Sequence, residues 1–72
     1  MAQLTVKQYD NLEDAIAHGT RVIVWRRGTE FLIVPLRLRN VNRRECIDAR
    51  HPSTGSRMTL WIDEIDAIEP VN

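Results

Sequence analysis

The sequence predicts a mostly β fold, a small five-stranded barrel preceded by one short helix. The chain has 72 residues, which is enough for a single domain spanning 1–72. Near the N-terminus the apolar residues follow a helical spacing, and from Thr20 onward β-branched and aromatic residues alternate with polar ones. Turn residues divide this second region into five short segments. Together these observations favour a helix followed by five strands.

The helix is predicted over about residues 10–18. The segment Asp10-Asn11-Leu12-Glu13 has the form of a capping box, in which the first side chain and the fourth satisfy each other's backbone amides. Leu12, Ala15 and Ile16 lie on one helical stripe, and Gly19 follows where a helix commonly ends in a left-handed residue. A helix this short is not stable alone, so we expect it to pack on the strands.

The first two strands are predicted over 20–26 and 29–39, joined by a tight turn at Arg27-Gly28. Within the second strand, Leu36-Arg37-Leu38-Arg39 alternates apolar and basic residues. Pro35 has no backbone N–H and is therefore expected at an edge, a bulge or a bend. A bend fits a small barrel, because one strand then serves both halves of the sheet.

Three further strands complete the predicted sheet, over 44–50, 57–62 and 67–71. Turns at Asn40–Arg43 and Pro52–Gly55 separate them, and Asp63-Glu64-Ile65 is expected to form a single helical turn. This order of elements fits barrels of the Sm-like or SH3-like type. A helix on an open antiparallel sheet has the same local signals and remains the alternative. The strand near Pro35 or the C-terminal strand could pair with a second copy, so a homo-oligomer is a further expectation.

Charge is distributed in three blocks that cancel to a net charge of zero. Residues 1–19 carry −2, residues 20–58 carry +6 and residues 59–72 carry −4. Nine of the ten basic residues are arginines. Because arginine makes two-point contacts with phosphates and carboxylates, this composition favours a binding surface for one of those groups.

Composition also predicts where the protein resides. The single cysteine, Cys46, cannot form an intrachain disulfide, which suits a reducing compartment. The longest apolar runs, such as Phe31–Leu36, are far shorter than the roughly 20 residues of a membrane helix. The first residues lack the pattern of a signal peptide. We therefore expect a cytoplasmic protein with no membrane partner.

No set of residues predicts catalysis, a metal site or a cofactor. His18, His51 and Cys46 lack the spacing of metal ligands, and Cys46 in an alternating strand is expected to be a small buried residue. The acidic residues near the C-terminus could serve as an acid–base pair, but a solvated turn at the end of the barrel is the expected role of Asp63, Glu64 and Asp66. The sequence predicts a binding protein that is not an enzyme.

Two surfaces are candidates for that binding, and one of them is rich in arginine. Small barrels bind nucleic acids through basic strand faces and stacking aromatic side chains. The residues that could form such a face are Trp25, Arg26, Arg27, Arg37, Arg39, Arg43 and Arg44. The alternative is that these arginines are ordinary exposed strand residues and that Trp25 belongs to the core.

The other candidate surface follows from a resemblance. The segment Tyr9-Asp10-Asn11-Leu12-Glu13, followed by Ala15 and His18, resembles the start of the Rho-binding antiterminator (Rof) family of small bacterial proteins. Gly28-Thr29-Glu30 and Leu60-Trp61-Ile62-Asp63-Glu64-Ile65 fit later parts of that family's pattern.

The resemblance implies an Sm-like fold and a role in modulating Rho-dependent transcription termination. It also implies a protein partner, the Rho hexamer, whose RNA-binding surface the family is thought to cover. The partner-binding residues carried over to this chain are Tyr9, Asp10, Glu13 and Asp14. Carboxylates can occupy sites that are built for phosphates. The basic middle of this chain differs from the acidic barrels of that family.

A fainter resemblance is to the WYL domain of bacterial regulators, which is also Sm-like. Pro35-Leu36-Arg37-Leu38 and the region around Asp63-Glu64-Ile65 are similar to it. The Trp-Tyr-Leu signature is absent, since Arg44-Glu45-Cys46-Ile47 occupies its place.

Overall fold

The computed structural model describes residues 4–71, and its first element is the helix α1 (Val6–His18). Thr5 is the N-cap residue. Its Oγ1 accepts a hydrogen bond from the backbone N–H of Gln8 at 3.2 Å, and Gln8 Oε1 accepts one from the N–H of Thr5 at 2.9 Å. The helix therefore begins four residues earlier than the sequence predicts, and the capping box expected at Asp10 and Glu13 is wrong. Both of those residues lie in the helix interior.

The helix starts earlier because its first turn, which precedes Asp10, packs against the core. Leu4, just before the N-cap, is buried, and Tyr9 packs against the same hydrophobic core. Leu4 precedes the N-cap, and Tyr9 is the fourth residue of the helix. Apolar residues at these two positions form a hydrophobic staple, which stabilises the start of a helix. At the other end the prediction is confirmed, because Gly19 has a φ of 67° and its N–H donates to the carbonyl of Ala15.

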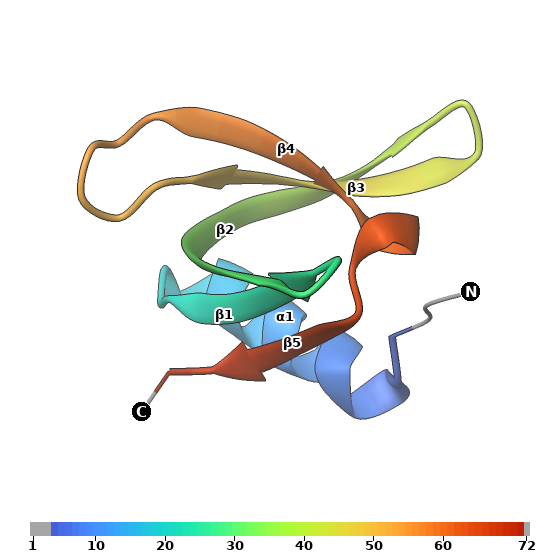
Figure 1. Cartoon of the computed structure of the whole chain (residues 1–72), viewed down its shortest axis with the longest axis horizontal. Coiled ribbons are helices and arrows are strands. Elements are labelled where there is room, and N and C mark those ends of the chain that lie inside the picture. Colours follow the sequence, from blue (N-terminus) through green and yellow to red (C-terminus); the bar gives the residue numbers. More distant parts are fainter. Residues whose placement is uncertain (1–3, 72) are drawn as a thin grey trace.

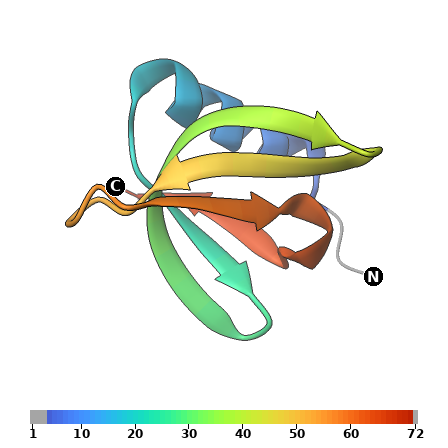
Figure 2. The same ribbon diagram turned by 90° about the horizontal axis from the view of Figure 1, so that it is seen from above.

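Five antiparallel strands follow the helix and form one sheet with the order β4-β3-β2-β1-β5 (Figures 1 and 2). Their bounds are β1 (Val22–Arg26), β2 (Thr29–Val41), β3 (Arg44–Arg50), β4 (Arg57–Trp61) and β5 (Ala67–Pro70). The short 3-10 helix η1 (Ile62–Glu64) joins β4 to β5, close to the predicted helical turn. The prediction of a mostly β fold with one N-terminal helix is confirmed.

The long strand β2 is bent and belongs to both halves of the sheet, as the sequence predicts. Its residues 29–33 pair with β1, and its residues 34–41 pair with β3. The register shifts by one residue between Pro35 and Arg37, so Leu36 forms a bulge. Pro35 is buried at this crossing point, where β2 passes from its pairing with β1 to its pairing with β3, next to the bulge.

The sheet is not closed into a complete barrel. In residues 4–71, β4 pairs only with β3, and β5 pairs only with β1, so both are edge strands. The architecture agrees in this respect with the alternative of a helix on an open antiparallel sheet. Although β2 is central in the strand order, its residues from Val34 onward pair with β3 alone, and the C-terminal strand β5 is an edge strand, so pairing with a second copy stays a prediction.

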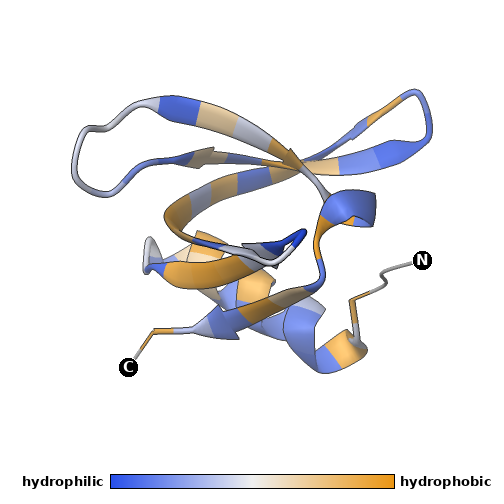
Figure 3. Ribbon diagram, in the orientation of Figure 1, coloured by the Kyte–Doolittle hydropathy of each residue, from blue (hydrophilic) through white to orange (hydrophobic). Residues whose placement is uncertain are grey.

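The hydrophobic core lies between α1 and the two halves of the bent sheet. Figure 3 shows hydrophobic residues along β1, and hydrophilic residues at η1 and at the β2–β3 hairpin. The buried cluster consists of Leu4, Leu12, Ala15, Val22, Val24, Ile33, Ile47, Ala49, Leu60, Ile62, Ile65 and Ile68. The core thus joins the helix to every strand. No helix among the residues that the structure describes is long and apolar enough to cross a membrane.

Candidate functional site

The outward side of α1 carries three exposed carboxylates, Asp10, Glu13 and Asp14, which we call the acidic helix face. None of the three has a cationic partner within 4.0 Å in residues 4–71. Glu13 and Asp14 lie three and four residues after Asp10, the spacings at which helical side chains are neighbours. Like charges at these spacings weaken a helix, so this face carries a small cost in stability.

Tyr9 borders the acidic helix face and attaches it to the sheet. Its ring packs against the core, and its hydroxyl donates a 2.8 Å hydrogen bond to Glu45 Oε1 on β3. Partial burial, the hydrogen bond to Glu45 and the charge of that carboxylate all raise the pKa of Tyr9, burial most strongly. Tyr9 therefore positions the helix and leaves only part of its surface for a partner.

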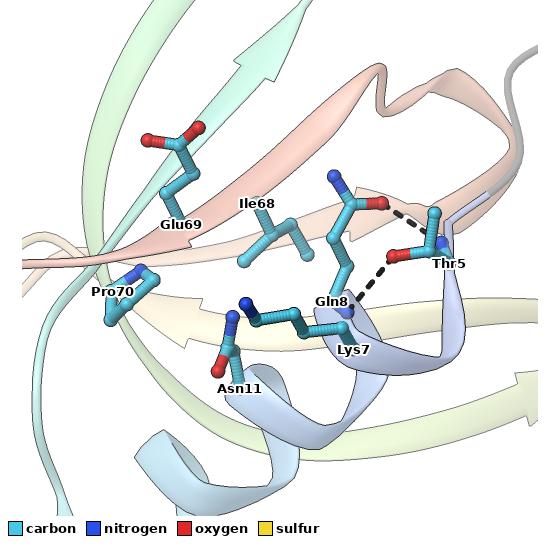
Figure 4. Close-up of a pocket in the computed structure, with 7 residues that line it drawn as sticks. All are labelled: Thr5, Lys7, Gln8, Asn11, Ile68, Glu69 and Pro70. Atoms are coloured by element: carbon cyan, nitrogen blue, oxygen red, sulfur yellow. Dashed lines mark hydrogen bonds between the residues drawn. The ribbon is translucent and has the colours of Figure 1, made fainter.

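A shallow groove of about 460 Å³ runs between α1 and the edge strand β5 (Figure 4). Thr5, Lys7, Gln8, Asn11, Ile68, Glu69 and Pro70 line it. Asn11 also borders a second hollow formed by Asp10, Glu13 and Asp14. The groove and the acidic helix face therefore form one continuous surface.

The predicted arginine candidates lie at several places, the first of which is the β1–β2 hairpin. Trp25 is half-buried on β1. The guanidinium of Arg26 lies 5.0 Å from the centre of the Phe31 ring. The backbone N–H of Arg27 donates to Asp66 Oδ2 at 3.0 Å. The Arg26 side chain is thus engaged within the molecule, and Arg27 is held through its backbone.

The acidic residues around η1 bind the arginines of two hairpins. Arg44 makes a two-point contact with Asp63, with Nε at 2.9 Å from Oδ2 and Nη2 at 2.8 Å from Oδ1. Its guanidinium also lies 4.3 Å from the Trp61 ring centre. Glu64 Oε2 is 3.7 Å from Nη2 of Arg44 and 3.9 Å from Nη2 of Arg27. The structure thus brings these two candidate arginines together.

These contacts add to the expected role of the C-terminal acidic residues. The hydrogen bonds from Arg44 are the main reason that the pKa of Asp63 is lowered. Asp63 and Asp66 are exposed, as expected of a solvated turn, and together with Glu64 they also bind Arg27 and Arg44 and thereby join distant parts of the chain.

Arg37 and Arg39 meet at Asp48 on the outer face of β2 and β3. Asp48 Oδ2 accepts hydrogen bonds from Arg37 Nε at 2.8 Å and from Arg39 Nε at 2.6 Å. Asp48 Oδ1 accepts from Arg39 Nη2 at 3.0 Å and from the Thr59 hydroxyl at 3.3 Å. The hydrogen bonds from Arg39 and Arg37 lower the pKa of Asp48 to about 2. Only 16% of the Asp48 side chain is exposed.

Arg43, the remaining candidate, is exposed at the tip of the β2–β3 hairpin. Asn42 and Arg43 have φ values of 50° and 66° and form the two-residue turn between Val41 and Arg44. Positive φ at both positions is the requirement of a type I′ hairpin turn, in which glycine is usual at the second position. Arg43 therefore adopts a backbone conformation that is strained for its side chain.

Sequence reasoning missed two arginines on the same outer face, Arg50 and Arg57. They lie directly opposite each other on β3 and β4. Neither has a carboxylate within 4.0 Å in the part of the chain that the structure describes. The sequence contains one indication of this position for Arg50. Asp48 and Arg50 are two residues apart on one strand, so their side chains lie on the same face.

The histidines and the cysteine have local structural roles. His18 Nδ1 lies 2.8 Å from the carbonyl oxygen of Asp14, and His51 Nδ1 accepts a hydrogen bond from the N–H of Ser53 at 3.2 Å. Cys46 is fully buried, as predicted. Within residues 4–71, no group of three or more histidine, cysteine or acidic side chains is placed to hold a metal ion.

Comparison with known proteins adds no assignment. No protein-family model matches the chain, and no curated protein matches it in sequence. The acidic helix face and the arginine-rich outer face of the sheet are therefore the two candidate binding surfaces of this protein.

Proposed function

We propose that this protein is a non-enzymatic regulatory protein that binds a basic protein surface through its acidic helix face. The observation that carries the proposal is the contrast between two sets of carboxylates. Those of Asp48, Asp63 and Glu64 lie within 4.0 Å of arginines in the same chain. Those on the outward side of α1 have no such partner in residues 4–71, so they are free to meet cations on another molecule.

The structure of the helix supports this role, because these carboxylates make no hydrogen bond or ion pair with another side chain in residues 4–71. Thr5 and Gln8 cap the helix, so Asp10 and Glu13 are not needed to begin it. Leu12 and Ala15 attach it to the core from the opposite side. A rigid helix that presents like charges at a stability cost suits complementary binding, in which opposed charges speed association and align the partners.

The resemblance of residues 9–18 to Rho-binding antiterminators identifies the Rho hexamer as the partner in this proposal. The protein would act in the cytoplasm, and its carboxylates would occupy sites that otherwise take RNA phosphates. The proposal also includes an Sm-like small barrel with an open seam. The N-terminal helix and the bent β2, which serves both halves of the sheet, support that classification.

Binding to purified Rho tests the proposal. We expect the wild-type protein to bind Rho in calorimetry and to displace a labelled RNA from it. The variant Asp10→Lys/Glu13→Lys should abolish both effects, because it places two cations against a cationic site. The matched control compares Glu13→Lys with Glu30→Lys, which makes the same charge change at an exposed position on β2. Only Glu13→Lys should weaken binding.

Two results would overturn the proposal. One is the absence of any binding between the wild-type protein and Rho at low salt. The other is an equal loss of binding for Glu13→Lys and Glu30→Lys, which would show that net charge and not the helix face determines the interaction. Circular dichroism of each variant confirms that the fold is intact.

A further inference from the structure

The outer face of β2, β3 and β4 carries a cluster of arginines around Asp48, which we call the Asp48 cluster. It consists of Arg37, Arg39, Asp48, Arg50 and Arg57. Strand pairing places Arg37 opposite Asp48 and Arg50 opposite Arg57. Four cations thus share one carboxylate, which leaves an excess charge of +3 on this face.

The bulge in β2 creates this cluster. Side chains of a strand alternate between its two faces, so one extra residue reverses the alternation beyond it. Leu36 is that residue. Beyond it, Leu38 packs against the core, and Arg37 and Arg39 are exposed on the face that Asp48 shares.

Asp48 orients two of the guanidinium groups and leaves most of their donors free. Arg37 donates to it through Nε alone, and Arg39 through Nε and Nη2. The side chain of Arg37 remains 68% exposed. The two guanidinium groups therefore present their remaining N–H groups to solvent. An anion could accept hydrogen bonds from these N–H groups in two-point contacts.

Arg50 and Arg57 add charge that the fold does not compensate. Like charges directly opposite each other on paired strands are destabilising. Both oxygens of Asp48, the acidic residue beside them on this face, are already engaged by Arg37, Arg39 and Thr59. A bound anion would relieve this repulsion.

The open shape of this strand face indicates which kind of anion the Asp48 cluster can bind. The hollow beside Asp48 is shallow, and Arg57, Met58 and Thr59 complete its lining. An open strand face offers no enclosure for a small ion. It does offer cations at intervals of about 6.6–6.8 Å along a strand and about 4.8 Å between strands. Such an array suits an extended polymer with a charge on every unit.

We infer that the Asp48 cluster binds the phosphate backbone of a single-stranded nucleic acid without base specificity. Trp61 lies on the same face, two residues after Thr59, but the Arg44 guanidinium stacks on its ring at 4.3 Å, and Trp25 lies on β1. The inference is independent of the proposed function, because the Asp48 cluster lies on the outer face of the sheet, whereas the acidic helix face lies on α1, on the far side of the molecule from β4 in Figure 1.

Fluorescence anisotropy of a labelled 12-nucleotide oligouridine tests the inference. With about three phosphates neutralised, log K should fall with log[salt] at a slope of about −2. The variant Arg50→Gln/Arg57→Gln should weaken binding on the order of tenfold at 50 mM salt and reduce the slope to about −0.7. This variant removes a repulsion, so its stability should equal or exceed that of the wild type.

The matched control is Lys7→Gln/Arg21→Gln, which removes two exposed cations at the helix end of the molecule. It should bind the oligonucleotide as the wild type does. The inference is overturned if the wild type does not bind oligouridine at 50 mM salt, or if the control variant loses as much affinity as Arg50→Gln/Arg57→Gln. It is also overturned if oligoglutamate of the same charge binds as tightly as oligouridine, which would make an acidic protein the occupant.

Discussion

The acidic helix face and the Asp48 cluster carry opposite charges, and the fold handles them in opposite ways. In the Asp48 cluster, one carboxylate from β3 lies within hydrogen-bond distance of two arginines from β2. On the helix, Asp10 has acidic residues three and four positions after it and Lys7 three positions before it, and no cation lies within 4.0 Å of its carboxylate in the described chain. The charge of the Asp48 cluster is partly neutralised by a carboxylate of the same chain. The carboxylates of the acidic helix face are instead available to solvent or to a partner.

The difference follows from the geometry of the two elements. A strand acquires neighbours from other strands, so Arg37 meets Asp48, which lies eleven residues away in sequence. An exposed helix face has only its own residues as neighbours, at spacings of three and four. Charges on such a face therefore remain unpaired unless the local sequence supplies the opposite charge. The predictions below test how independent the two surfaces are.

The largest effect is expected from Leu12→Ala, which weakens the attachment of the helix to the sheet. Leu12 is fully buried in the core, and truncation of such a residue typically costs about 2–5 kcal/mol in the free energy of unfolding. Urea denaturation measures this loss. Val6→Ala is the control, because Val6 is 79% exposed and its truncation should change stability by less than about 0.5 kcal/mol.

Hydrogen exchange on Leu12→Ala then tests whether the two surfaces belong to one cooperative unit. We expect the amides of α1 and β3 to lose protection together, since both elements contribute to the same core. Loss of protection in α1 alone would show that the helix and the sheet unfold separately.

The next largest effect distinguishes the two possible starts of the helix. Thr5→Ala removes the N-cap hydroxyl and should lower the free energy of unfolding by about 1 kcal/mol. Asp10→Ala should change it by less than about 0.5 kcal/mol, because Asp10 is exposed in the helix interior. A larger loss for Asp10→Ala than for Thr5→Ala would contradict the helix start described here.

A smaller effect of opposite sign is expected on the acidic helix face. Asp10→Asn removes the repulsion of Asp10 with Glu13 and Asp14, which together outweigh its attraction to Lys7, and should stabilise the protein by about 0.2–0.5 kcal/mol at low salt. Glu30→Gln, at an exposed strand position, should have no comparable effect. Thermal unfolding at low and high salt measures the difference, which should shrink at high salt. Destabilisation by Asp10→Asn would mean that this carboxylate has a structural role.

The smallest effect is confined to acid pH and reports on the Asp48 cluster. The pKa of Asp48 in the folded protein is about 2, below its ordinary value of 3.8. Its contribution to stability is therefore complete above about pH 4 and is lost as the pH falls toward 2. Asp48→Asn should reduce the loss of thermal stability between pH 4 and pH 2. An unchanged pH dependence in this variant would show that the arginines do not stabilise the carboxylate.

Much of the secondary structure was predictable from the sequence because its signals are local. Alternation and turn residues located β3 at Arg44–Arg50 and the helix end at Gly19, where the structure has them. The helix start was missed because Thr5 and Gln8 match the same capping pattern as Asp10 and Glu13. The local sequence pattern does not distinguish the two possible helix starts. The burial of Leu4 in the core favours the start at Thr5.

The two candidate surfaces were predictable to different extents, because only one of them is formed by residues that are close together in sequence. The acidic helix face depends on residues adjacent in sequence, and a helical spacing is sufficient to place them together. The arginines were identified as a group, but their partners Asp48, Asp63 and Glu64 were not, and neither were Arg50 and Arg57. The contacts of Arg37 and Arg39 with Asp48 require the strand register, which the bulge at Leu36 shifts by one residue, and those of Asp63 and Glu64 require the position of η1.

The sequence by itself determined a mostly β domain, its N-terminal helix, and the block of arginines between two acidic ends. These properties follow from composition and from side-chain periodicity, which act over a few residues. Only the tertiary structure decided that the C-terminal acidic turn neutralises Arg27 and Arg44 while the helix carboxylates remain unpaired. The reason is that an ion pair depends on distances of a few ångströms in space, and in this chain the position of η1 brings Asp63 and Glu64 to Arg44 and Arg27.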